Sequence, residues 1–160
     1  MSPDRTAQSR DCAICAKHRG EGSLKGQLVG RYDGFWVYHG QPGADGLAAL
    51  GHLVIESDRH APYLADLTDA EAVALGPLTS HLARALRDEL DVPFVFTAVI
   101  GRHIAHFHEH LLPRHPGVPE DVPWHQSDEA GPQANTEAVA KLARRLAKRL
   151  EQIRESPDRA

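Results

Sequence analysis

One short run constrains the fold of this chain more than any other part of the sequence: residues 106–114 read HFHEHLLPR. The apolar run before it, at 93–100, has the composition of a strand, and residues 101–103 have that of a turn. We therefore predict that residues 104–112 form the returning strand of a hairpin. Because successive side chains of a strand point to opposite faces, the three histidines of the run would then share one face.

Three imidazoles on one strand face favour a functional site over a structural role, because histidine acts as nucleophile, proton shuttle or metal ligand near neutral pH. They are His106, His108 and His110. One possibility is a metal site, since histidines at alternating positions can chelate one zinc ion. The Cα atoms of the outer two would lie roughly 13 Å apart, too far to share one ion easily. The other possibility is nucleophilic attack on phosphorus by the central histidine, with its neighbours donating to phosphate oxygens or to the leaving group.

The length and charge of the chain argue against several classes of protein. A chain of 160 residues suits one domain with tails. Its net charge of −4 offers no basic surface, so nucleic acid and acidic membranes are disfavoured as partners. Residues 1–10 are polar and lack the apolar core of a signal peptide, and no run approaches the ~20 apolar residues of a membrane span. We expect a soluble, cytoplasmic protein with a disordered N-terminal tail.

The elements before the histidine run indicate an α+β fold. Short apolar runs predict three strands, at residues 28–29, 35–39 and 51–56. A helix should then extend to Leu90, because Thr68 and Glu71 form a capping box before a helical apolar pattern. Pro77 lies inside this helix and should kink it near Val73. The succession of strands, helix, strands and helix is typical of an α+β fold with a largely antiparallel sheet of four or five strands.

The remainder of the chain should form a loop and a helix. Residues 113–132 contain five prolines, which predicts an ordered or semi-ordered loop with Trp124 as its anchor. Residues 136–154 combine one apolar stripe with many cations, and this pattern favours a solvated amphipathic helix over a nucleic-acid or membrane ligand. The chain is therefore divided into a tail at 1–10, a domain at 11–125, and a linker with a C-terminal amphipathic helix at 126–160.

The two cysteines, Cys12 and Cys15, form a C-x-x-C pair. Such a pair is half of a tetrahedral zinc site, because two thiolates can reach one ion from a tight turn. A redox pair is an alternative, although no βαβ pattern surrounds it, and two unremarkable thiols are another. The zinc interpretation requires two further ligands.

The histidine run and its Leu-Leu-Pro-Arg continuation resemble the signature of the histidine triad family. The likeness extends to Gly51-His52 and to residues 59–60, 64–68 and 113–117. This resemblance implies a five-stranded antiparallel sheet with two main helices, commonly paired into a homodimer. It also implies a hydrolase or nucleotidyl transferase that acts on nucleoside 5′-phosphate derivatives, such as dinucleoside polyphosphates or phosphoramidates, through a covalent nucleotidyl-histidine.

The resemblance assigns roles by position. His108 resembles the nucleophile, and His110 and His52 resemble its catalytic neighbours on the same and the adjacent strand. The candidates for substrate binding are His39, Arg102, His103 and His106. Relatives with a structural zinc imply a Cys2His2 site made of Cys12, Cys15, His60 and His106. Such a site would tie the N-terminal arm to the sheet, with His18 as a competing fourth ligand.

The sequence departs from the family's better-known phosphoramidate hydrolases at three places. Arg102-His103 stands where they carry Gln-Ser, so Arg102 either holds a phosphate or is a solvated turn residue. Gly40 stands where they carry a ribose-binding Asp. Glu109 occupies a position that is usually apolar, and if it faces the layer beneath the sheet it must pair, for example with an arginine of a dimer partner, or reach water. The alternatives to a nucleotide hydrolase are a zinc-dependent hydrolase that uses the histidine face and a catalytically inactive nucleotide-binding module.

Overall fold

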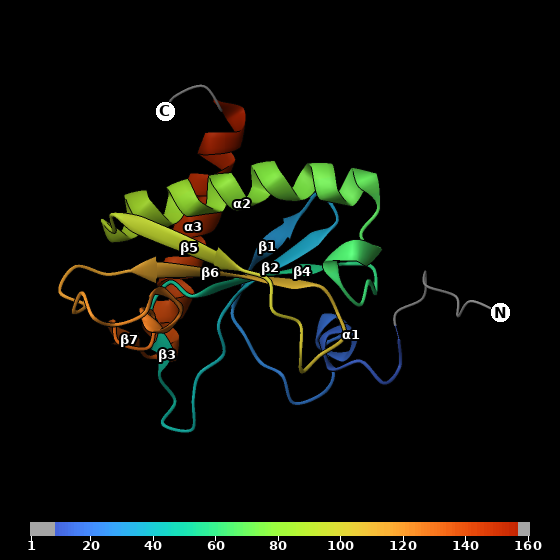
Figure 1. Cartoon of the computed structure of the whole chain (residues 1–160), viewed down its shortest axis with the longest axis horizontal. Helices are drawn as coiled ribbons and strands as arrows, with labels where there is room; N and C mark the ends of the chain where they lie inside the picture. The colour runs from blue at the N-terminus through green and yellow to red at the C-terminus, as the bar shows by residue number, and fades with distance from the viewer. Residues whose placement is uncertain (1–8, 157–160) are drawn as a thin grey trace.

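The structure is a computed structural model that describes residues 9–156. Its centre is a five-stranded antiparallel sheet in the order β1-β2-β4-β6-β5, with α2 on one side and α1 on the other (Figure 1). The strands are β1 (Leu28–Tyr32), β2 (Phe35–His39), β4 (Leu53–Ser57), β5 (Phe94–Ala98) and β6 (His108–Arg114). The predicted α+β fold is confirmed, whereas the tail predicted at residues 1–10 lies almost entirely outside the described residues.

The remaining elements surround this sheet. The helices are α1 (Ala13–His18), α2 (Asp69–Leu90) and α3 (Thr136–Glu155), with short 3₁₀ turns η1 (Leu64–Asp66) and η2 (Trp124–Gln126). A second, two-stranded sheet pairs β3 (Ala48–Ala49) with β7 (Gln133–Ala134). None of the helices within residues 9–156 is long and apolar enough to cross a membrane.

Helix α2 covers one face of the sheet and begins where the sequence predicts. The Thr68 side chain accepts the Glu71 N–H, and the Glu71 carboxylate accepts the Thr68 N–H at 2.8 Å, which completes the capping box. Pro77 does not interrupt the helix, which continues to Leu90. The face turned to the sheet is fully buried and consists of Leu78, Leu82, Ala85 and Leu86.

Helix α3 uses its apolar stripe to complete the core. Its buried residues are Val139, Leu142, Ala143, Leu146 and Leu150. Some of the cations outside this stripe pair with acids of neighbouring elements: Arg145 lies 2.6 Å from Glu89 of α2, and Arg154 lies 2.6 Å from Asp33 between β1 and β2. The amphipathic pattern is therefore confirmed, and the division of the chain at residue 125 stays a prediction.

The hairpin predicted around the histidine run is wrong at its tip. Strand β6 begins at His108, so residues 99–107 form an irregular connection. Phe107 shows the reason, because its backbone N–H and C=O bond to Ala61 and Ser57 at and beyond the end of β4 instead of pairing with β5. The first histidine of the run therefore precedes the strand and does not share a strand face with the other two.

Glu109 lies on the face of β6 that packs against α2. It is buried, and the Thr79 hydroxyl of α2 donates to its Oε2 at 2.9 Å. Burial raises the pKa of Glu109, and the hydrogen bonds from Thr79 and Thr97 oppose that rise. The polar partners that the sequence requires for this carboxylate thus come from the same chain.

Candidate functional site

Four potential metal ligands converge where α1 meets the end of β4 and the connection before β6. They are Cys12, Cys15, His60 and His106, and their ligand atoms lie within 4.8 Å of one another. The His106 Nδ1 lies 3.4 Å from both sulfur atoms, and the His60 Nδ1 lies 3.5 Å from the Cys15 Sγ. Sulfur and nitrogen ligands of a tetrahedral zinc ion with ordinary bond lengths would be about 3.6 Å apart. The geometry of the group therefore fits zinc.

The chemical state of these side chains also fits a metal. The His106 Nε2 donates to the Ser57 carbonyl oxygen at 2.7 Å, so the proton is on Nε2 and the lone pair of Nδ1 faces the sulfur atoms. Burial lowers the pKa of His106 to about 4, which keeps the ring neutral. Burial and the neighbouring Cys12 raise the pKa of Cys15 to about 11. Metal ligation requires thiolates, and a bound cation would supply the charge that stabilises them.

His18 does not join this group. Its Nε2 lies 2.9 Å from the Glu56 carboxylate, and its ring stacks on Trp36 with 4.8 Å between centroids. Lys17 also pairs with Glu56, so two successive residues of α1 attach this helix to β4. Burial alone would raise the pKa of Glu56, but these two partners hold it below its usual value, which makes it a buried carboxylate beside the site.

A pocket of about 260 Å³ opens on the face of the sheet next to α1. Its floor consists of Val54 and Glu56 of β4 and of His108 and His110 of β6. These side chains meet because positions 54 and 110, and positions 56 and 108, are direct partners in the antiparallel register. Helix α1 contributes Ile14 to the wall.

His108 presents one free ring nitrogen in this pocket. Its Nδ1 donates to the carbonyl oxygen of His106 at 2.7 Å. Because a carbonyl oxygen can only accept, the proton of the neutral ring must be on Nδ1. The lone pair is then on Nε2, the nitrogen that the protein leaves available for a substrate.

His110 is the end of a chain of three polar side chains. Its Nδ1 lies 2.9 Å from the Nε2 of His52, and the Nδ1 of His52 lies 3.0 Å from a carboxylate oxygen of Asp128. Burial, together with the nearby His52 and His108, lowers the pKa of His110 to about 4. His110 and His52, the two predicted catalytic neighbours of His108, are thus brought together in this structure.

Of the other candidates for substrate binding, His39 lines this pocket but offers it no free ring nitrogen, and Arg102, His103 and His106 do not line it. His39 is buried, its Nε2 accepts the Gly51 N–H at 2.9 Å, and its Nδ1 lies 3.1 Å from the Gly40 carbonyl oxygen, so both ring nitrogens bind backbone. Arg102 and His103 are exposed in the connection between β5 and β6 and do not line the pocket. His106 belongs to the metal-ligand group described above.

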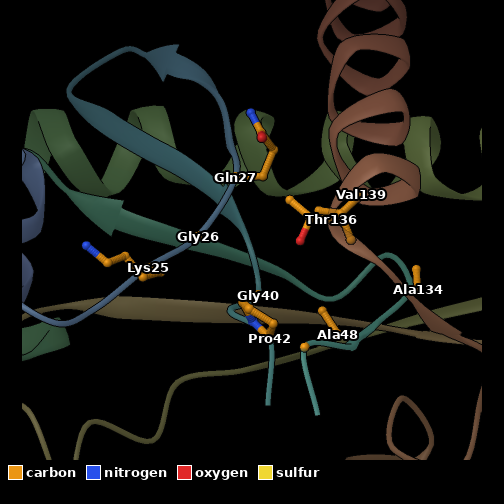
Figure 2. Close-up of a pocket in the computed structure, with 10 residues that line it drawn as sticks. Lys25, Gly26, Gln27, Gly40, Pro42, Ala48, Ala134, Thr136 and Val139 are labelled. Atoms are coloured by element: carbon orange, nitrogen blue, oxygen red, sulfur yellow. The ribbon is translucent and has the colours of Figure 1, made fainter. Parts of the chain in front are cut away.

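Gly40 has a steric reason to lack a side chain. A Cβ atom at this position would lie 3.3 to 3.5 Å from the ring and Cβ of His52. A side chain at position 40 would therefore crowd His52, the second member of the Asp128–His52–His110 chain. Gly40 and Lys25 also line a second cavity of about 200 Å³, which continues from the first toward the N-terminus of α3. Figure 2 shows Ala48, Ala134 and Val139, three residues with small side chains that line this second cavity.

Asp128 is the site residue that sequence reasoning missed. It follows η2 in the proline-rich segment, and only 5% of its surface is exposed. Neither its spacing from the histidine run nor its composition distinguishes it from the other acids of that segment. The burial of Asp128 and its contact with His52 can be recognised only in the folded structure.

The sequence matches no protein-family model and no curated protein. Solved structures do match. A zinc-bound histidine triad family protein from Mycobacterium smegmatis superposes with a TM-score of 0.66 at 18% identity, over 91% of this chain and 97% of its own. A Hit-like protein involved in cell-cycle regulation from Bartonella henselae gives 0.65 at 15% identity, over 89% and 98%.

A hypothetical histidine triad nucleotide-binding protein from Sulfolobus tokodaii gives 0.65 at 18% identity, over 89% of this chain and 94% of its own. These similarities extend over most of both chains in each pair. Because the identities are low, they show a shared fold. The resemblance visible in the histidine run is thereby confirmed at the level of architecture: the chain has the fold of the histidine triad proteins.

Proposed function

We propose that the protein is a hydrolase or nucleotidyl transferase acting on nucleoside 5′-phosphate derivatives, such as dinucleoside polyphosphates or phosphoramidates. The Nε2 of His108 would attack the phosphorus atom, the bond to the leaving group would break, and a nucleotidyl-histidine would form. Water or another acceptor would then release the nucleotide and restore His108. A structural neighbour that is named as a nucleotide-binding protein supports this class of substrate.

The observation that carries the proposal is the hydrogen bond from the His108 Nδ1 to the His106 carbonyl oxygen, at 2.7 Å. A histidine nucleophile needs its second nitrogen held by an acceptor, because this fixes the tautomer with a bare Nε2. The same bond stabilises positive charge on the ring as the bond to phosphorus forms. His110 lies beside this ring, with 5.2 Å between centroids, where it can exchange a proton with the leaving group or with water.

We further propose that Cys12, Cys15, His60 and His106 hold one structural zinc ion. When bound, the ion would cross-link α1, the segment after β4 and the connection before β6. Both ring nitrogens of His106 are engaged in this arrangement, which favours a ligand role over a phosphate contact. The backbone of the same residue orients His108, so fixing His106 would also fix the nucleophile.

The proposed form in solution is a homodimer through the β5 edge of the sheet. Strand β5 is an outer strand, and Phe94 is 58% exposed on it while Ile100, just beyond its end, is 63% exposed. An unpaired edge with exposed apolar side chains is a usual place for a second copy to bind. Sedimentation equilibrium should give twice the chain mass for the wild type and the mass of one chain for Ile100→Asp.

Intact-protein mass spectrometry of the His110→Asn variant tests the covalent step. If His110 activates water, its loss should let the intermediate accumulate. Mixing the variant with a p-nitrophenyl ester of a nucleotide, whose leaving group needs no proton, should therefore add the mass of one nucleoside monophosphate. The matched control is the double variant with His108→Asn, which should remain unmodified. An adduct that persists in the double variant would place the nucleophile elsewhere, and a wild type without turnover on the whole panel would refute the activity.

The rival in which the histidine face binds a catalytic zinc receives no support from the donor positions. Within residues 9–156, the group of three or more metal-binding side chains is the one built on the two cysteines. His108 lies outside it, and its Nδ1 is held by a carbonyl oxygen. A chelator should accordingly affect the stability of the protein before it affects the chemistry in the pocket.

A further inference from the structure

We infer that Asp128 is a positioning residue that, together with His52, stores the proton with which His110 acts first as an acid and then as a base. This role rests on the proposed function, because it describes how protons reach the reacting groups. It adds to that function a carboxylate from the proline-rich segment that no feature of the histidine run indicates.

The pairing of β3 with β7 brings Asp128 and His52 together. Strand β3 lies just before His52 and strand β7 lies just after Asp128, and the two strands pair with each other. The Leu50 N–H also bonds to the Pro132 carbonyl oxygen at 2.9 Å, next to this pair. The segment that carries Asp128 is thus attached to the segment that carries His52, and the carboxylate is delivered to the ring from outside the five-stranded sheet.

The donors and acceptors of the chain allow two protonation states. Asp128 can only accept as a carboxylate, so the Nδ1 of His52 carries a proton in both states. When His52 is neutral, its Nε2 accepts from the Nδ1 of His110, and the Nε2 of His110 is a bare base. When His52 is a cation, its Nε2 donates to the Nδ1 of His110, and the Nε2 of His110 carries a proton that it can donate.

Each half of the proposed reaction uses one of these states. As the bond from phosphorus to the leaving group breaks, the Nε2 of His110 gives its proton to the leaving group, and the proton between the rings moves from His52 to His110. When water attacks the nucleotidyl-histidine, the Nε2 of His110 takes a proton from the water and the proton between the rings returns to His52. One proton leaves and one returns in each cycle, so the chain ends as it began.

The charges around the chain favour storage on His52. Burial lowers the pKa of His110 to about 4, whereas His52 has a carboxylate 3.0 Å from its other nitrogen. Burial alone would raise the pKa of Asp128, but the contact with His52 keeps it below its usual value, so the carboxylate is ionised. The other titratable groups that face the two rings are His39 of β2, Glu56 of β4 and His108 of β6, each of them present in the variants proposed below.

The Asp128→Asn variant separates storage of the proton from a purely structural role, because the amide can keep the contact with His52 and loses only the charge. With an amine leaving group, which must be protonated, we expect kcat/KM to fall about 10- to 100-fold. With a p-nitrophenyl ester of the same nucleotide, which leaves without a proton, we expect a change of less than about threefold. The exposed neighbour Glu129→Gln is the matched control and should change neither value.

The pH profile gives a second readout of the same variant. Because the carboxylate favours the protonated state of the chain, its loss should move the high-pH limb of kcat/KM for the amine substrate to lower pH, by about one pH unit or more. Equal losses on both leaving groups with an unchanged profile would show that Asp128 is only structural and would overturn the inference.

Nitrogen NMR of the histidine rings tests the arrangement even if no substrate is found. We expect His52 to carry its proton on Nδ1 in the wild type and in Asp128→Asn, and to lose this preference in Asp128→Ala. A wild-type His52 with a bare Nδ1 would refute the role of Asp128. The expected tautomer in a protein that turns over no nucleotide would instead refute the proposed activity and leave the chain of contacts established.

Discussion

His106 and His108 are two residues apart in the sequence and have opposite surroundings. His106 is fully buried, and its two ring nitrogens face the Ser57 carbonyl oxygen and the two cysteine sulfurs. His108 is only half-buried, and one of its ring nitrogens is left to the pocket. The same residue type therefore supplies a candidate metal ligand at one position and a candidate nucleophile two residues later.

The start of β6 explains this difference. His108 is the first residue of the strand, so its side chain is set by the register against β4, beside Glu56. His106 lies in the irregular connection, where the chain turns toward the end of β4 and places the ring in the interior. The comparison predicts that one region governs folding and the other governs chemistry, and each expectation below tests that separation.

The largest effect should come from the pocket. Replacing His108 by Asn removes the nucleophile, so we expect turnover of the nucleotide panel to fall by at least about 10³-fold. The free energy of unfolding should change by no more than about 1 kcal/mol, because the ring is half-buried and makes one hydrogen bond to backbone. Steady-state kinetics and urea unfolding of the same preparation measure both quantities.

The metal content of the His108→Asn protein is the control for this expectation. It should equal that of the wild type, since no ligand atom is changed. A variant that loses its metal or unfolds early would show that the two regions are one cooperative unit.

The second largest effect should come from the metal-ligand group, and it should change the stability of the protein more than its activity. Cys15→Ser removes a buried ligand, so we expect loss of bound zinc and a loss of several kcal/mol of stability relative to the metal-loaded wild type. A chelator should lower the melting temperature of the wild type to near that of the variant and leave the variant unchanged. The fraction of Cys15→Ser that remains folded should keep its activity to within a few-fold. An equal response of both proteins to the chelator would remove the cysteines from the metal site.

Acid should destabilise both regions of the metal-free protein through their buried neutral histidines. The pKa values of His106 and His110 are lowered from 6.5 to about 4, mainly by burial. Since the unfolded chain takes up protons below pH 6.5 and the folded rings do not, stability should be full above pH 6.5 and fall as the pH drops to about 4. Each ring contributes up to about 1.4 kcal/mol per pH unit.

The matched variant for this pH dependence is His110→Gln, which removes one of the two titrating rings. Its plot of unfolding free energy against pH should be shallower than that of the wild type between pH 4 and pH 6.5. Parallel plots would show that His110 is already accessible to protons in the folded state.

The architecture could be predicted from the sequence because local sequence patterns specify most of its helices and strands. The Thr68–Glu71 capping box, the apolar run at residues 53–55 and the helical stripe of α3 each specify one element without help from distant parts of the chain. The tip of the hairpin could not be predicted. Residues 104–107 have the composition of a strand, but the backbone of Phe107 bonds to Ala61 and Ser57 and not to β5. Tertiary contacts therefore decide the conformation of residues 104–107.

The same distinction applies to the site. The ligand group and the histidines were indicated by residue types and by resemblance, and the fold places them in two clusters. Asp128 and Thr79 could not be found in this way, since each is a common polar residue whose importance comes only from the buried group that it faces. Buried partners of this kind depend on how distant segments pack.

The smallest effect should come from the opposite face of β6, which belongs to neither region. Burial raises the pKa of Glu109, so the unfolded chain ionises more readily than the folded one and stability falls as the pH rises above 4.5. Glu109→Gln cannot ionise and can still accept from Thr79, so we expect it to be about 1 kcal/mol more stable at pH 7 and equal to the wild type below pH 4.5. Thr79→Val, which removes the donor, should instead cost about 1 kcal/mol. Turnover and zinc content should be unchanged in both variants. A change in either quantity would mean that the two faces of β6 are coupled. A lower stability of Glu109→Gln would mean that the ionised carboxylate is stabilised by its partners in the folded protein.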